Sequence, residues 1–194
     1  MKHWEKELPP GYREAFVIDA KNDKKLIRRM TLASLLVLGV FLWLAIIWQL
    51  PVLLHSASFS VAAPLAFCVS LIFYMVLHEL VHGAAYKALT GQKLTFGMTL
   101  SVAFCGVPEI YVYRKASLIA VLAPFVVFTV LGLIALALLP DGWWRFFLLL
   151  FLGLHIGGCS GDLYNTWLYL TRFKDPRTLT RDTGPIQTFY LPET

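Results

Sequence analysis

Charged residues are scarce in this chain. They make up 15% of its 194 residues, whereas hydrophobic residues make up 58%. Soluble globular domains carry about 25% charged residues, so this composition excludes an ordinary soluble domain. Several apolar runs reach the length of about 20 residues that crosses a bilayer as a helix. The sequence therefore predicts a mainly α-helical membrane protein.

Cysteine is also rare, and no disulfide framework is expected. Cys68, Cys105 and Cys159 are an odd number without paired spacing, and we interpret them as small hydrophobic residues. We expect no cleavable signal peptide, because about thirty mostly polar residues precede the first apolar run. The formal net charge of +5 is spread along the chain instead of forming one patch, which argues against a nucleic-acid partner.

Four apolar segments are long enough to be membrane-spanning helices, at residues 30–54, 61–89, 116–139 and 143–170. They divide the chain into an N-terminal arm at 1–29, a four-helix integral-membrane domain at 30–171 and a tail at 172–194. Within the arm, the run Ala15–Ile18 predicts a short strand. The tail contains prolines and a Gly-Pro pair, and we expect it to be irregular.

The segment between the second and third spans has a different pattern. Apolar residues alternate with small or polar ones from Leu94 to Phe104, which is the period of a strand. The following residues, 105–108, contain Gly and Pro and can turn the chain, and Glu109–Tyr113 can return as a second strand. The sequence thus predicts a small β-hairpin between these two helices.

Basic residues predict the orientation in the membrane. Of the 17 Lys and Arg residues, all but Arg145 lie in the N-terminal arm, in the stretch from Lys87 to Lys115, or in the tail. Lys and Arg accumulate on the cytoplasmic side, so both termini are expected to be cytoplasmic. At 1.5 Å per residue, His78, His82 and Asp162 then lie about 26–32 Å along spans that run in the same direction. We expect these three side chains in one layer near the cytoplasmic face.

The most informative motif is His78-Glu79-Leu80-Val81-His82, inside the second span. Residues four apart lie on one face of a helix, so the two imidazoles can share a metal ion. Glu79 is offset around the helix, where it can take a proton from water instead of binding the metal, as the motif requires in zinc hydrolases. The alternative is a structural pair of histidines bridged by Glu79, because ionisable groups within a span need partners.

A catalytic zinc usually has three protein ligands and an open position. Asp162 is the main candidate for the third, since a carboxylate within an apolar span is costly unless it is paired or coordinating. Asn165 lies one turn further and could orient it. Glu109 is the other acidic candidate, or a substrate-contacting residue. His155 could hydrogen-bond in the core or lie near the substrate, and Cys159 is a less favoured ligand.

These residues resemble the small bacterial zincin peptidases, which look like minimal relatives of the site-2 proteases. The resemblance is carried by the motif followed by Gly83, by the strand-like insert, by Ala123-Pro124, by Gly161-Asp162 and by the opening Leu8-Pro9-Pro10-Gly11-Tyr12. In site-2 proteases the histidine pair and a distant aspartate bind zinc, and the glutamate is the catalytic base. The resemblance implies these roles for His78, His82, Asp162 and Glu79, in a bacterial cell membrane.

The leading hypothesis is an intramembrane zinc metallopeptidase that hydrolyses peptide bonds of membrane-protein or peptide substrates. A first alternative is a non-catalytic metal-binding membrane scaffold, whose site would be closed by four protein ligands. A second is a metal carrier or transporter, which four spans without an internal repeat make weak. Beyond helix faces of small residues, no pattern in the sequence indicates an oligomeric state.

Overall fold

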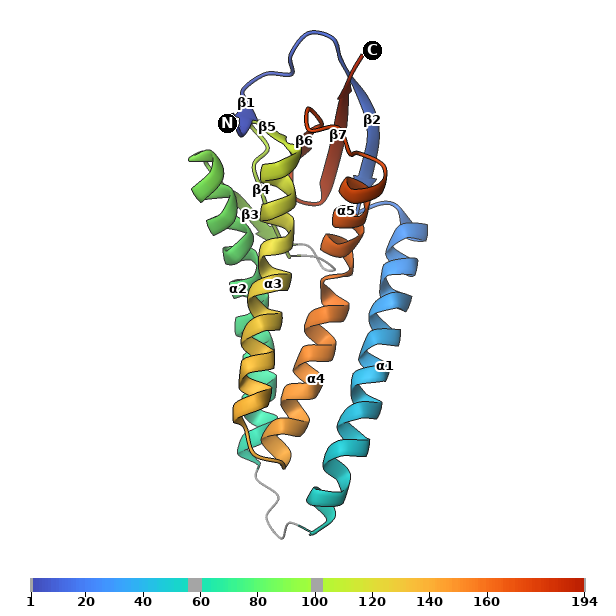
Figure 1. The fold of residues 1–194 in the computed structure, drawn as a ribbon, viewed down its shortest axis with the longest axis vertical. Coiled ribbons are helices and arrows are strands. Elements are labelled where there is room, and N and C mark those ends of the chain that lie inside the picture. The colour runs from blue at the N-terminus through green and yellow to red at the C-terminus, as the bar shows by residue number, and fades with distance from the viewer. Residues whose placement is uncertain (1, 56–60, 99–102, 194) are drawn as a thin grey trace. The chain divides into compact units, whose positions relative to one another are not determined.

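The computed structural model describes residues 2–55, 61–98 and 103–193 and confirms a mainly helical fold (Figure 1). Three of its helices are long and apolar enough to cross a membrane. A bent pair of shorter helices would be a fourth span if it is counted as one. The helices are α1 (Lys24–His55), α2 (Ala62–Thr90), α3 (Arg114–Leu138), α4 (Trp143–Gly158) and α5 (Ser160–Thr171).

The predicted fourth span is two helices and not one. α4 ends at Gly158, α5 begins at Ser160, and the backbone N–H of Cys159 bonds back to the His155 carbonyl at 3.0 Å. Glycine is among the poorest helix formers, and Gly157, Gly158 and Gly161 surround this break. Hydropathy alone does not reveal the break, because apolar residues lie on both sides of it.

The long helices expose apolar side chains to their surroundings. Leu36 of α1 is 72% exposed, Phe73 of α2 is 64% exposed and Leu138 of α3 is 79% exposed. Soluble proteins rarely expose contiguous apolar surface on this scale, whereas lipid tails accept it. The helices are therefore typical of a multi-pass membrane protein.

The chain divides into two compact units. The first contains residues 1–28, 76–124 and 162–194, and the second contains 29–75 and 125–161. The first unit holds every strand among the described residues, the last part of α2, the start of α3 and nearly all of α5. It therefore contains the histidine pair, Glu79 and Asp162.

A five-stranded antiparallel sheet organises the first unit, in the order β1-β5-β6-β7-β2. Its strands are β1 (Trp4–Glu5), β2 (Tyr12–Asp19), β5 (Tyr111–Tyr113), β6 (Leu179–Asp182) and β7 (Ile186–Pro192). The strand expected at Ala15–Ile18 is confirmed as part of β2. The expectation of an irregular tail was wrong, because β6 and β7 form a hairpin there and β7 pairs with β2.

The predicted hairpin between α2 and α3 exists but has different strands. β3 (Thr95–Met98) pairs with β4 (Ala103–Gly106), whereas residues 99–102 of the predicted strand lie outside the described residues. Glu109–Tyr113 does not return onto this hairpin, since β5 pairs with β1 and β6 instead. Alternation identifies a strand but not its partner, and β5 finds its partners at the two ends of the chain.

Two apolar clusters hold the helices of the first unit against the strands. Tyr86 of α2 packs with Val112 of β5 and Ala120 of α3. Tyr169 of α5 packs with Phe189 of β7 and with Phe173, whose ring stacks on Phe189 at 4.5 Å. These contacts fix the ends of α2, α3 and α5 from which the candidate site is built.

In the second unit, α1 packs closely on α4. A Cβ atom at Gly157 would lie 2.9 Å from the Ser34 carbonyl oxygen, so only glycine permits this approach. The Ser34 hydroxyl donates to the Gly157 carbonyl at 2.6 Å. Near the other end of these helices, the buried Gln49 amide donates to Asp141 at 3.1 Å and accepts from the Gly142 N–H at 2.8 Å.

Candidate metal centre

His78 and His82 lie one turn apart on α2, as the motif predicts. Their ring centroids are 4.9 Å apart and the ring planes are inclined by 78°. One nitrogen of each imidazole and a carboxylate oxygen of Glu79 all lie within 4.8 Å of one another. This His/Glu group could hold a metal ion.

Asp162 brings a second helix to the histidine pair. Its Oδ2 lies 3.3 Å from His78 Nε2 and its Oδ1 lies 3.5 Å from His82 Nε2. The two imidazoles therefore face different oxygens of one carboxylate, although Asp162 is 80 residues beyond His82 in the chain. The expected layer of three side chains is thus present within the first unit.

The break at Cys159 explains how a carboxylate is tolerated here. Because α5 begins at Ser160, Asp162 lies in its first turn. Unpaired backbone N–H groups and the helix dipole make this end of a helix favourable for negative charge, by about 0.3–1 kcal/mol at exposed sites. An uninterrupted fourth span would have placed the same carboxylate in mid-helix without this support.

His82 is oriented by a backbone carbonyl that α3 leaves free. Its Nδ1 lies 2.8 Å from the Ala120 carbonyl oxygen. A carbonyl only accepts, so Nδ1 carries a proton, and Nε2 is the nitrogen on the Asp162 side that could bind a metal. Pro124 lies four residues after Ala120 and has no N–H to bond that carbonyl within the helix. This hydrogen bond fixes the tautomer that a metal ligand requires.

Glu79 lies between the histidine pair and the β3–β4 hairpin. Its half-buried carboxylate accepts a hydrogen bond from the Cys105 backbone N–H of β4. A Cβ atom at Gly83 would lie 2.7 Å from the Phe96 ring of β3, so this glycine lets the hairpin approach α2. The hairpin therefore borders the same stretch of α2 as the candidate site.

Two other predicted residues lie in the first unit. Asn165 is buried, and its amide donates to the Gln187 side chain of β7. Glu109 is exposed in the turn between β4 and β5, and it belongs to neither metal-capable group found among the described residues.

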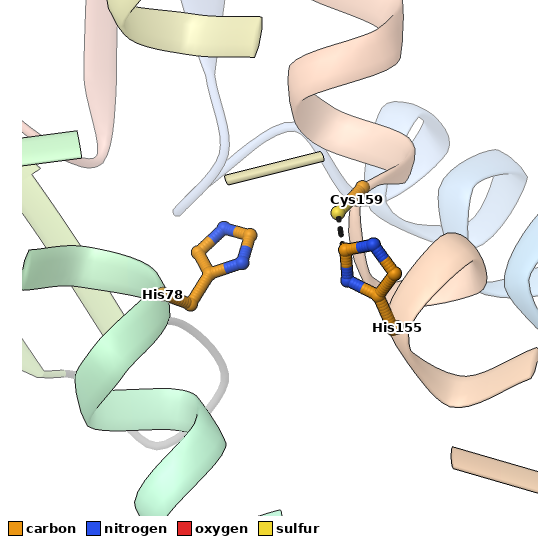
Figure 2. A group of neighbouring side chains, drawn as sticks. All are labelled: His78, His155 and Cys159. Atoms are coloured by element: carbon orange, nitrogen blue, oxygen red, sulfur yellow. Dashed lines mark hydrogen bonds between the residues drawn. The ribbon is translucent and has the colours of Figure 1, made fainter. Parts of the chain in front are cut away.

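His155 and Cys159 belong to the second unit (Figure 2). His155 is fully buried, with Nδ1 at 2.7 Å from the Tyr74 hydroxyl and Nε2 at 3.0 Å from Thr129 Oγ1. The Cys159 sulfur lies 3.7 Å from His155 Nδ1. Both nitrogens of His155 thus have contacts within this unit, in keeping with the expectation of a hydrogen-bonding core histidine.

Sequence reasoning missed the groups that support the site. The Ala120 carbonyl and the Cys105 N–H are backbone atoms, which no residue pattern identifies directly. Pro124 did carry a signal, because a proline within a helix frees the carbonyl four residues earlier. Nothing in the sequence indicates which side chain that carbonyl would meet.

The donor atoms suit zinc. Imidazole nitrogen and carboxylate oxygen are common zinc ligands, and two histidines with one carboxylate form a known set in catalytic sites. Asp162 has no lysine or arginine partner among the described salt bridges, so a cation between the imidazoles and the carboxylate would supply the missing charge.

Comparison with protein families gives one match. The family described as "Putative zincin peptidase" matches residues 71–176, which is more than half of the chain. The chain belongs to this zincin peptidase family. The matched region of the zincin contains the histidine pair, Glu79 and Asp162, and it ends just beyond α5. No curated protein and no solved structure matches the chain significantly. Membership in the family indicates a metallopeptidase.

Proposed function

We propose that the protein is an intramembrane zinc metalloendopeptidase, related to the site-2 proteases, that hydrolyses peptide bonds of membrane-associated substrates. The observation that supports this most is the meeting of the H-E-x-x-H helix with Asp162 at 3.3 and 3.5 Å. Three ligands from two helices leave room for water and substrate, as catalytic zinc sites do.

His78, His82 and Asp162 are the proposed ligands. A bound zinc ion would supply Lewis acidity, polarising the scissile carbonyl and making water a stronger acid. Two of the three side chains are already oriented, since His82 is bound to the Ala120 carbonyl and Asp162 lies in the first turn of α5. Preorganised groups of this kind avoid reorganisation during the reaction.

Glu79 is the proposed catalytic base. It would take the proton of the attacking water and deliver it to the amine that leaves when the peptide bond breaks. The hydrogen bond from the Cys105 backbone keeps its carboxylate on the side of α2 that faces β4. A glutamate held beside the ligands, but outside them, suits proton transfer better than coordination.

The β3–β4 hairpin is proposed to bind the substrate. Among the described strands β3 pairs only with β4, so its other edge offers unpaired backbone groups. Phe96 and Met98 on this strand are 48% and 75% exposed and could contact apolar substrate side chains. Pairing with an extended substrate would expose peptide bonds that a helical substrate shields.

The test compares wild type with Glu79→Gln for cleavage of a membrane-embedded reporter peptide by the purified protein in proteoliposomes. We expect Glu79→Gln to retain zinc and to lose at least about 100-fold in rate, the usual contribution of a general base. Glu14→Gln, on the exposed part of β2, is the matched control and should cleave as wild type does.

Equal rates for wild type and Glu79→Gln would remove Glu79 from the mechanism. Zinc binding without any cleavage by wild type would instead favour the non-catalytic scaffold.

A further inference from the structure

A chain of buried polar side chains connects α2 and α5 through the C-terminal hairpin, outside the proposed ligands. The Tyr86 hydroxyl of α2 donates to Asp182 Oδ2 at 2.8 Å. The same oxygen accepts from Gln187 Nε2 at 3.0 Å, and Gln187 Oε1 accepts from the Asn165 amide of α5. Tyr86, Asp182 and Asn165 are at most 6% exposed. We call these four residues the polar bridge.

The polar bridge reaches each helix one turn beyond a proposed ligand. Tyr86 follows His82 by four residues on α2, and Asn165 follows Asp162 by three residues on α5. Residues at these spacings share a helix face. Any change in the separation of Tyr86 and Asn165 is therefore passed to His82 and Asp162, whose side chains lie 3.5 Å apart.

The middle of the polar bridge is held rigidly. Asp182 and Gln187 are paired across the β6–β7 hairpin. The Gly184 N–H donates to Asp182 Oδ1 at 2.9 Å, and the Val107 N–H donates to the Asp182 carbonyl at 2.9 Å. Gly106 allows this approach, since a Cβ there would lie 2.7 Å from the Gly184 nitrogen. These contacts restrict the movement of Asp182 at the middle of the polar bridge.

Packing alone does not require this arrangement. Burial raises the pKa of the Asp182 carboxyl to about 6, so its three hydrogen bonds do not fully offset the loss of water. Apolar side chains of similar volume would join the same elements without that cost. Directional hydrogen bonds differ from apolar contacts in fixing distance and orientation, which a metal site needs.

We propose that Tyr86, Asp182, Gln187 and Asn165 are positioning residues that set the spacing of α2 and α5 and thereby the affinity of the metal site. This inference depends on the proposed site at His78, His82 and Asp162, and extends it to the C-terminal hairpin. Outer residues that orient metal ligands typically change metal affinity by about 10–100-fold when substituted.

The experiment measures the zinc dissociation constant of the full-length protein in detergent by competition with a chelator. Tyr86→Phe removes one hydroxyl, and we expect zinc to bind about tenfold more weakly. Tyr113→Phe is the matched control, because the Tyr113 hydroxyl of β5 donates to the Glu5 carboxylate of β1 at 2.8 Å, a hydrogen bond within the same sheet that lies outside the polar bridge. It should bind zinc as wild type does.

A second variant separates positioning from general loss of stability. Gln187→Leu cuts the polar bridge at its other end. Loss of either hydrogen bond already disconnects α2 from α5 along the polar bridge. The double variant Tyr86→Phe/Gln187→Leu should therefore bind zinc no more weakly than either single variant. Independent structural defects would instead multiply to about 100-fold, as additivity requires. Thermal unfolding of the zinc-free proteins shows which variants are folded.

Unchanged zinc affinity in Tyr86→Phe, an equal loss in Tyr113→Phe, or multiplied losses in the double variant would each overturn the inference. These outcomes leave the peptidase proposal standing as long as His82→Ala abolishes zinc binding. Equal binding by wild type and His82→Ala would overturn both. If the variants show the expected zinc affinities but wild type cleaves no reporter, this inference stands and the peptidase proposal fails.

Discussion

At the scale of single residues, the backbone prepares side chains for the site. Asp162 is accepted because α5 begins two residues before it, and His82 is oriented because Pro124 cannot bond the Ala120 carbonyl. In both cases an interruption of regular helix leaves backbone groups without a partner inside the helix. The N–H groups at the start of α5 favour the Asp162 carboxylate, and the Ala120 carbonyl accepts a hydrogen bond from His82. Glycine and proline near the candidate site therefore mark the helix interruptions that support it, just as the histidines mark the proposed ligands.

Replacing Pro124 tests this reading of His82. In Pro124→Ala the new N–H competes for the Ala120 carbonyl, so we expect zinc to bind up to about tenfold more weakly. Helix stability should be unchanged or higher, since proline costs about 3 kcal/mol in a helix interior. Zinc competition and thermal unfolding check the two effects separately.

The control is Pro51→Ala, because Pro51 is also inside a helix but belongs to α1 in the other unit. It should leave zinc affinity unchanged. Weaker binding in both variants, or in neither, would contradict the role given to Pro124.

At the scale of elements, the close packing of α1 on α4 depends on one of the two glycines that end α4. Gly157 and Gly158 are adjacent, yet their surroundings differ. A Cβ at Gly157 would meet the backbone of Ser34 in α1, whereas one at Gly158 would have nothing within 4 Å. The contact of α1 with α4 therefore tolerates a side chain at only one of the two positions.

Gly157→Ala should destabilise the protein by about 1–3 kcal/mol, the usual effect of overpacking. Gly158→Ala should be neutral or slightly stabilising, because alanine is the better helix former. Thermal unfolding in detergent compares the two. A larger loss for Gly158→Ala than for Gly157→Ala would show that α1 does not approach α4 at Gly157.

At the scale of the whole molecule, the sequence predicted what local patterns determine. Long apolar runs identified the helices, and the His78–His82 spacing predicted which face of α2 carries the candidate site. The Lys and Arg distribution still gives the orientation only as a prediction. The short strands β6 and β7 were missed, because each forms backbone hydrogen bonds with a strand far away in the chain. β6 pairs with β5 and β7 pairs with β2. The bridge from Tyr86 to Asn165 depends on those strands and was therefore not predictable.

The central claim is that one zinc ion is held by two histidines of α2 and a carboxylate of α5. Elemental analysis of the purified protein tests it most directly. We predict one zinc per chain in wild type, loss of zinc in Asp162→Ala and full retention in Glu109→Gln, whose carboxyl group is exposed. Zinc retained by Asp162→Ala but lost by Glu109→Gln, or no zinc in wild type, would contradict the account.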